Sequence, residues 1–196
     1  MSAAKLITRL TLQPHPEGGW YREIYRSPTR VETPQGGRSA LTAIYYLLER
    51  GQLSRWHVVR ADELWHFYGG APLELFEYDP TLRRLARHVL GPVATVGADD
   101  GVDAAAGSGR SAAEGALGAA VGAGTAAAAV GPARETISVA VIPTGIWQAA
   151  RSLGAYSLVG CTVGPGFDFA DFQFVSDLTS RADHFRGELA PLVSLL

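Results

Sequence analysis

The sequence predicts an all-β domain, an antiparallel β-sandwich with a short helix at each end. Short runs rich in β-branched and aromatic residues alternate with turns that contain Gly and Pro. This pattern is typical of sandwiches and barrels, whereas alternating strands and helices would indicate a parallel sheet. The 196 residues leave room for one domain, so we expect a single domain over residues 1–196 that carries one insertion.

Ten runs are predicted strands, each short and bounded by turn residues. Helices are expected only near the ends, over Ala3–Leu10 and Leu178–Arg186. Residues 33–37, Thr-Pro-Gln-Gly-Gly, are expected to form a turn. The predicted strands are Trp20–Arg26, Leu41–Leu48, Leu53–Val59, Glu63–Tyr68, Leu73–Tyr78, Leu82–Leu90, Thr136–Ile142, Gly145–Arg151, Ala155–Val163 and Gln173–Val175.

The insertion is a Gly- and Ala-rich segment over residues 91–133. Its 43 residues contain 10 Gly, 16 Ala and no aromatic residue. Gly and Ala offer little apolar area, so ordering this segment would recover little of the lost backbone entropy. We therefore expect a surface loop without chemistry, interrupting a compact aromatic core.

Composition excludes several function classes. A formal net charge of −2 and a pI near 6.2 give no basic surface for nucleic acid. The single cysteine, Cys161, excludes an internal disulfide framework, and we expect it to be inert on a strand. No apolar run reaches the roughly 18 residues of a membrane span, and the first residues lack the apolar run of a signal peptide. We therefore expect a cytoplasmic protein without a membrane partner.

A first polar segment lies where two predicted strands meet at a short turn. His57 is near the end of one strand and Glu63 begins the next. Because side chains alternate along a strand, we expect both to face one cavity, whereas His66 has the opposite parity to Glu63. The residues that share these two inner faces are Arg55, Val59, Trp65 and Phe67. An imidazole beside a carboxylate suits a metal, a proton transfer or a buried hydrogen-bonded pair.

A second segment covers residues 141–148, Val-Ile-Pro-Thr-Gly-Ile-Trp-Gln. Pro143 fixes one backbone angle and Gly145 tolerates an unusual one, which predicts a tight turn. The strand that follows delivers Trp147 and Gln148.

The two segments resemble the two motifs of the cupin superfamily, which builds small jelly-roll barrels. The usual first motif has two histidines two residues apart, a glutamate four residues beyond the second and a glycine seven residues later. His57, Glu63 and Gly70 fall on this spacing. The second motif has Pro-x-Gly and then a histidine three residues after the glycine, and Pro143 and Gly145 match its start. The resemblance implies a cupin jelly-roll.

Three longer stretches look more specifically like the uncharacterised Cupin-5 type family. They are residues 15–23, 63–68 and 164–172. The resemblance covers residues 10–90 and 134–176 and leaves the insertion outside. It implies a fold and a pocket, without an assigned reaction.

Two of the four customary metal-ligand positions of a cupin carry other residues here. Val59 stands where the second histidine belongs, and Gln148 stands at the last histidine. Val donates nothing and a neutral amide is a poor ligand for transition metals, so we favour no metal or other cofactor. The alternative is a divalent metal held by His57, Glu63, Gln148 and, if it turned inward, His66. Without a metal, His57 could act as base or acid.

Further residues are candidate ligand contacts, each with a structural alternative. Glu17 precedes two glycines that either form a turn or let the backbone approach a ligand. Asp168 either caps a turn or closes the pocket mouth. The aromatic candidates are most simply core, and His15 is expected on the surface. The candidate ligand contacts are Glu17, Tyr21, Arg55, Trp65, Phe67, Trp147, Gln148, Phe167 and Asp168.

Three functions remain open on the sequence. The first is a pocket for a carbohydrate-like or carbonyl-bearing polar ligand, with metal-independent isomerase or epimerase chemistry by His57 and Glu63. The second is a binding or sensing module without turnover, and the third a metal-dependent oxygenase or isomerase. We also expect a homodimer, because a sandwich exposes an outer sheet face and an edge strand. Leu64, His66 and Tyr68 are expected near that contact.

Overall fold

The computed structural model describes residues 1–93 and 136–177. These residues belong to one compact unit, Met1–Val93 with Arg134–Leu196. The predicted helix over residues 178–186 and nearly all of the insertion over 91–133 lie outside the described residues.

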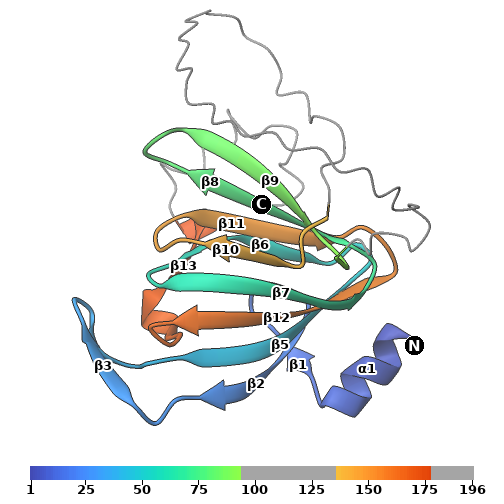
Figure 1. Cartoon of the computed structure of the whole chain (residues 1–196), viewed down its shortest axis with the longest axis horizontal. Coiled ribbons are helices and arrows are strands. Elements are labelled where there is room, and N and C mark those ends of the chain that lie inside the picture. Colours follow the sequence, from blue (N-terminus) through green and yellow to red (C-terminus); the bar gives the residue numbers. More distant parts are fainter. Residues whose placement is uncertain (94–135, 178–196) are drawn as a thin grey trace, which may run out of the picture. The chain divides into compact units, whose positions relative to one another are not determined.

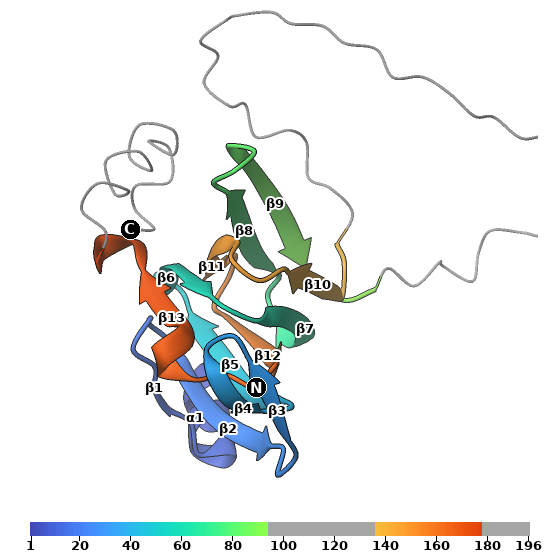
Figure 2. The same cartoon turned by 90° about the vertical axis from the view of Figure 1, so that its left-hand side faces the viewer.

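Two antiparallel sheets form the sandwich, as predicted (Figures 1 and 2). The six-stranded sheet has the order β1-β2-β5-β12-β7-β10, and the five-stranded sheet has the order β13-β6-β11-β8-β9. The strands of the first are β1 (Gln13–Pro14), β2 (Trp20–Arg26), β5 (Thr42–Glu49), β12 (Tyr156–Gly164), β7 (Asp62–Gly70) and β10 (Val139–Ile142). Those of the second are β13 (Phe172–Phe174), β6 (Leu53–Val59), β11 (Trp147–Ser152), β8 (Leu73–Asp79) and β9 (Arg84–Leu90).

The main core lies between the sheets, where alternating residues of both meet. Its largest members are Tyr46, Trp65 and the leucines of β5, β8 and β9, all fully buried. A second cluster on the other face of the five-stranded sheet is centred on Trp56 and Trp147. β10 shows the alternation of exposed and buried residues that is expected of a strand with one face in the core.

The turn expected over residues 33–37 is present at residues 34 and 35, but the two strands that flank it were not predicted. β3 (Arg30–Thr33) and β4 (Gly36–Ser39) pair across it as a hairpin that forms its own small sheet (Figure 2). These strands are polar and half exposed, so they lack the apolar alternation from which strands are predicted. The very short β1 was missed for the same reason.

A single α-helix, α1 (Ala3–Leu10), is present among the described residues, with the bounds predicted. Ser2 caps its start, and Thr11 ends it in the left-handed conformation. Two short 3₁₀ turns, η1 (Phe169–Asp171) and η2 (Val175–Asp177), flank β13. Within residues 1–93 and 136–177, no helix has the length and apolar character needed to cross a membrane.

Candidate functional site

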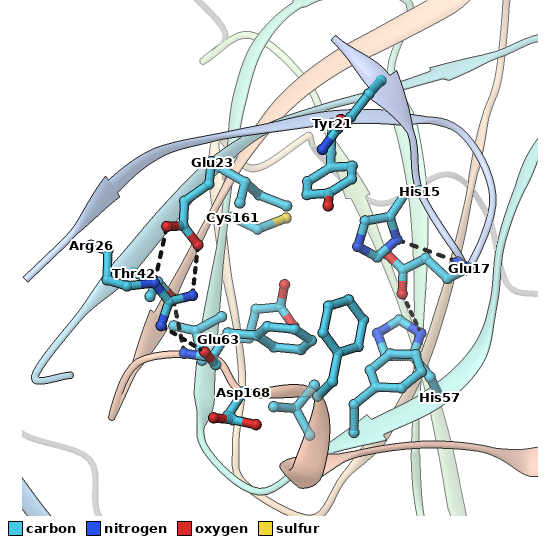
Figure 3. A pocket seen from close by; sticks show the side chains of 17 residues that line it. His15, Glu17, Tyr21, Glu23, Arg26, Thr42, His57, Glu63, Cys161 and Asp168 are labelled. Carbon is cyan, nitrogen blue, oxygen red and sulfur yellow. Dashed lines mark hydrogen bonds and ion pairs between the residues drawn. The ribbon is translucent and has the colours of Figure 1, made fainter. Parts of the chain in front are cut away.

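A cavity of about 370 Å³ lies at the end of the sandwich where β5 and β7 begin and β6 and β12 end. This volume is in the range of small-molecule sites. The side chains that line it, several of which are labelled in Figure 3, come from both sheets and from two loops. They are Gln13, His15, Glu17, Tyr21, Glu23, Arg26, Thr42, Ile44, His57, Val59, Glu63, Cys161, Val163, Phe167, Asp168, Phe169 and Phe172.

A tight loop over residues 15–19 brings Glu17 into the cavity. The Glu17 carbonyl accepts a hydrogen bond from the backbone N–H of Arg55 at 3.1 Å. Gly18 has φ +116°, and a Cβ on it would lie 2.0 Å from the Leu53 carbonyl oxygen. The two glycines therefore let the loop approach strands β5 and β6. This supports the turn interpretation, because the backbone that the glycines approach belongs to the protein itself.

Glu17 lies between two imidazoles. Its carboxylate is 3.0 Å from Nδ1 of His57 and 3.4 Å from Nδ1 of His15. Nδ1 of His57 also lies 2.7 Å from the Arg55 carbonyl oxygen. Since both neighbours of this nitrogen are acceptors, Nδ1 of His57 carries a proton and donates.

His15 has the opposite arrangement. The backbone N–H of Glu17 donates to Nδ1 of His15 at 3.3 Å, so this nitrogen accepts and the proton of a neutral ring sits on Nε2. The 3.4 Å contact of the same nitrogen with the carboxylate is then not an ion pair. Burial lowers the pKa of His15, outweighing the charge of Glu17, which agrees with a neutral ring.

The pKa values of the Glu17–His57 pair move apart. Burial raises the pKa of Glu17, but the charge and hydrogen bond of His57 outweigh burial and leave it below its ordinary value. Burial lowers the pKa of His57, but Glu17 outweighs this and leaves it above its ordinary value. Both directions favour the ionised pair, an imidazolium beside a carboxylate.

Glu63 is held by a second hydrogen-bonded chain. The indole N–H of Trp65 donates to Oε1 of Gln148 at 2.9 Å, and Nε2 of Gln148 donates to Oε2 of Glu63 at 2.6 Å. Because an indole N–H only donates, the orientation of the Gln148 amide is determined. Because Oε2 accepts the amide N–H, a proton bound to this acid belongs on the other oxygen, Oε1. Burial raises the pKa of Glu63 and favours this protonated form.

Cys161 adds a thiol to the same wall. It is buried, and burial raises its pKa well above the ordinary value, with the nearby carboxylates of Glu63 and Glu17 acting in the same direction. The thiol is therefore protonated at neutral pH and is a poor nucleophile, as expected for an inert cysteine.

The opposite side of the cavity carries an ion pair and an aromatic group. Arg26 donates to both carboxylate oxygens of Glu23, at 3.0 and 2.7 Å, and to the Phe167 carbonyl oxygen at 3.1 Å. Figure 3 shows this pair across the hollow from Glu17 and the two imidazoles. Asp168 caps η1 by accepting from the backbone N–H of Ala170 at 2.9 Å, and it also lines the cavity.

Several residues predicted at the site lie elsewhere. Gln148, predicted to line the pocket, is 1% exposed, donates to Glu63 and is not among the residues that line this cavity. Trp65 and Trp147 are buried in the two cores, and Phe67 packs against the first. Arg55 is exposed, donates to the Pro16 carbonyl oxygen at 2.7 Å and stacks over Phe174.

The remaining predicted residues do line the cavity. They are Glu17, Tyr21, His57, Glu63, Phe167 and Asp168. His66 is absent from its wall and has the parity of Tyr68, which is 52% exposed.

His15 was expected on the surface, but its side chain is only 7% exposed. The sequence signal that could have indicated burial was the position of His15, two residues before Glu17 in a Gly-Gly turn. A short constrained loop of this kind can direct both polar side chains into the same interior. Arg26 was not singled out, because strand arginines are usually solvated.

The four customary metal positions do not fit a metal ion. Val59 has no donor atom, and Oε1 of Gln148 already accepts the indole N–H of Trp65. Oε2 of Glu63 accepts the amide N–H, and Nδ1 of His57 faces Glu17. Among the residues that the structure describes, no group of three or more His, Cys, Asp or Glu side chains is arranged to hold a metal ion.

Comparison with known proteins agrees with this fold. The family described as Cupin superfamily (DUF985) matches residues 4–107 and 117–175, so the match enters the Gly- and Ala-rich segment from both sides. A hypothetical protein from Leishmania major is similar over 100% of this chain and 97% of its own, with 25% identity and a TM-score of 0.66. A protein from Shewanella oneidensis is 26% identical over 96% of each chain, with a TM-score of 0.65.

Oxalate decarboxylase from Bacillus subtilis is more distant. It is 12% identical over 93% of this chain and 36% of its own, with a TM-score of 0.50, which shows a shared fold alone. No curated protein matches the chain. Since the family match spans most of the residues, and the two sheets have the cupin arrangement, this chain belongs to the DUF985 family of the cupin superfamily.

Proposed function

We propose that the cavity binds a small carbonyl-bearing or carbohydrate-like ligand and catalyses metal-independent proton transfer, an isomerisation or epimerisation. The observation that carries this proposal is the placement of Glu17 at Nδ1 of His57, 3.0 Å away, with Glu63 in the same wall. Pairs of titratable groups whose environments push their pKa values apart are typical of acid–base sites.

In this proposal His57 moves a proton at Nε2. Its Nδ1 proton is directed at Glu17 and the Arg55 carbonyl, so Nε2 is the nitrogen left for a ligand. Figure 3 shows this second ring nitrogen on the cavity side. A raised pKa makes the neutral ring a stronger base and keeps a protonated fraction available near neutral pH.

Glu63 supplies the complementary acid. Its raised pKa favours the protonated form, and the bond from Gln148 to Oε2 leaves Oε1 to donate. The neutral fraction of His57 takes the proton from the carbon next to the ligand carbonyl at Nε2 and becomes the imidazolium, while Glu63 gives its proton to the carbonyl oxygen and becomes the carboxylate. The product is a neutral enediol. The imidazolium then gives a proton to the other face of the same carbon or to the neighbouring carbon, and the Glu63 carboxylate takes a proton from an enediol hydroxyl, which restores the carbonyl and both side chains.

No step in this scheme needs a metal. The imidazolium that forms on His57 and the proton that Glu63 donates stabilise the charge that develops on the carbonyl oxygen, a role that a metal fulfils in metal-dependent enzymes. Val59 has no donor atom for a metal, and Oε1 of Gln148 already accepts the indole N–H of Trp65, which supports this choice over the metal-dependent alternative.

The test is exchange of carbon-bound hydrogen in D₂O. Chelator-treated protein is incubated with aldoses, ketoses and 2-oxo acids, and proton NMR follows loss of the signal next to the carbonyl. We expect exchange by the wild type, none by His57→Asn, and full exchange by His66→Asn, which changes a histidine outside the cavity wall.

Binding of the same compounds, measured by calorimetry, separates the alternatives. Retained binding by His57→Asn with lost exchange supports catalysis. Binding by the wild type without exchange would instead assign a binding or sensing module. Exchange that appears only after iron, manganese or nickel is added, with stoichiometric metal by elemental analysis, would establish the metal-dependent alternative.

A further inference from the structure

The charges around the cavity point to the class of ligand that it accepts. Among the lining residues that the structure describes, Arg26 is the one Lys or Arg side chain. Its guanidinium forms a fork with Glu23, at 3.0 and 2.7 Å, and a third bond to the Phe167 carbonyl. This is the geometry with which arginine binds a carboxylate or phosphate, and here a residue of the chain already occupies it.

The other cation of the wall is also paired. The imidazolium of His57 faces Glu17, and His15 is neutral because burial lowers its pKa. Arg38 is outside the wall and forms a fork with Asp171 at 2.7 and 3.1 Å. Each of these positive groups therefore has an internal carboxylate within hydrogen-bonding distance.

Carboxylates outnumber cations in the lining. Glu17 and Glu23 balance His57 and Arg26, and Asp168 adds a further carboxylate, while Glu63 in its protonated form adds no charge of either sign. An anionic ligand would lose hydration on entry and meet these carboxylates without an unpaired cation. A neutral ligand has no charge for these carboxylates to repel, and it can hydrogen-bond to the polar side chains of the wall.

The aromatic part of the lining complements such a ligand. Phe167, Phe169 and Phe172 contact one another edge to face, with centroids 5.0 to 6.3 Å apart. Phe169 is 56% exposed although it is large and apolar, so part of this cluster is open to the cavity and to solvent. A ring that is apolar on one face and hydroxylated at its edge can pack on these rings and hydrogen-bond to the polar side.

We propose that the cavity selects an uncharged polar ring compound, a neutral monosaccharide, and rejects sugars that bear phosphate or carboxylate groups. This inference rests on the proposed function for its ligand class and adds the charge selection. The pairing of Arg26 with Glu23 is the specificity element, since the same guanidinium without its partner would receive an anion.

The test compares ligands that differ in one charged group. Binding of D-glucose, D-mannose and D-galactose is measured by saturation-transfer NMR and calorimetry beside that of their 6-phosphates and uronates. We expect the neutral sugars to bind about tenfold or more tightly than either anionic series. Absence of binding by every neutral sugar at millimolar concentration, or a preference for an anionic series, would overturn the inference.

A charge variant tests the specificity element directly. Glu23→Gln releases Arg26 from its carboxylate, so the 6-phosphates should gain about tenfold in affinity while the neutral sugars change little. Glu32→Gln, on the β3–β4 hairpin and outside the cavity wall, is the matched control and should change neither. Unchanged phosphate affinity in Glu23→Gln would refute the role of the ion pair.

The outcomes separate this inference from the proposed function. His57-dependent exchange on a sugar phosphate would refute the charge selection and keep the acid–base chemistry. Binding of neutral sugars without any exchange would keep the charge selection and refute the chemistry.

Discussion

Replacing Glu17 by Gln removes the charge from the centre of the site while keeping its shape. The amide oxygen can still accept the His57 Nδ1–H that the carboxylate accepts at 3.0 Å. Removing one member of a buried ion pair costs about 3–5 kcal/mol when the other stays charged. His57 can lose its proton instead, so we expect about 1–3 kcal/mol, the range for an imperfectly satisfied buried polar group.

The cost depends on pH because the raised pKa of His57 couples its protonation to folding. A raised folded-state pKa stabilises the protein fully below the ordinary value of 6.5, and this stabilisation is lost as pH rises through the folded-state value. The lowered pKa of Glu17 also stabilises the folded protein. This stabilisation is complete above the ordinary pKa of a glutamate and is lost as pH falls through the folded-state pKa of Glu17. The ion pair therefore stabilises the folded protein at pH values between the folded-state pKa of Glu17 and that of His57.

Two measurements follow from this reasoning. Urea unfolding should show Glu17→Gln destabilised more at about pH 5.5 than at about pH 9, where neutral His57 needs no counter-ion. Imidazole NMR, with His57→Asn for assignment, should show the pKa of His57 falling from above to below its ordinary value, because burial then dominates. Glu49→Gln, which removes a partly buried carboxylate bonded to Trp20, is the control without this pH dependence.

The reasoning is refuted by either of two results. One is a His57 pKa that stays above its ordinary value in Glu17→Gln. The other is a loss of stability that is equal at the two pH values, which would mean that the carboxylate acts through shape or neutral hydrogen bonds alone.

Three further predictions concern metal affinity, loop geometry and assembly. Val59→His combined with Gln148→His supplies the two missing imidazoles, so calorimetry should detect nickel or zinc binding at near-stoichiometric level in the double variant; equal affinity in the wild type would contradict the donor argument. Gly18→Ala should cost about 1–3 kcal/mol or more in urea unfolding, because a Cβ would lie 2.0 Å from a backbone oxygen of β6. Gly51→Ala, at φ +80° in open space, should cost only the smaller backbone strain, and similar losses in the two variants would refute the steric account. We also expect a homodimer through the outer face of the six-stranded sheet, where Tyr68 is 52% exposed, so Tyr68→Glu should sediment as a monomer; a wild-type monomer at micromolar concentration would contradict this expectation.

The strand positions of the site could be predicted, but its loop could not. Alternation on β6 and β7 indicated that His57 and Glu63 face one interior, and both line the cavity. The resemblance to the second cupin motif put Gln148 inside, but it could not tell a wall residue from one behind the wall. Gln148 lies opposite His57 in the strand register and donates to Glu63, which separates it from the hollow.

His15 and Arg26 show where local pattern carries no information. The side chain of His15 turns inward because residues 15–19 close a turn that is also bonded to β6. The bond to β6 joins positions that are distant in the chain. Arg26 is held by Glu23 three residues earlier and by the Phe167 carbonyl, which is 141 residues away. A period of two describes regular strands, and it does not extend to a loop or to a partner across the fold.

The amino-acid order alone determined the all-β class, the bounds of most strands and the family, because side-chain alternation and turn chemistry are local properties. Tertiary structure decided which polar groups meet. Glu17 becomes the partner of His57, and the Phe167 carbonyl that of Arg26, only when the folded chain brings these distant positions within hydrogen-bonding distance. Protonation and ligand charge depend on burial and on neighbours a few ångströms away, and these exist only in the folded chain.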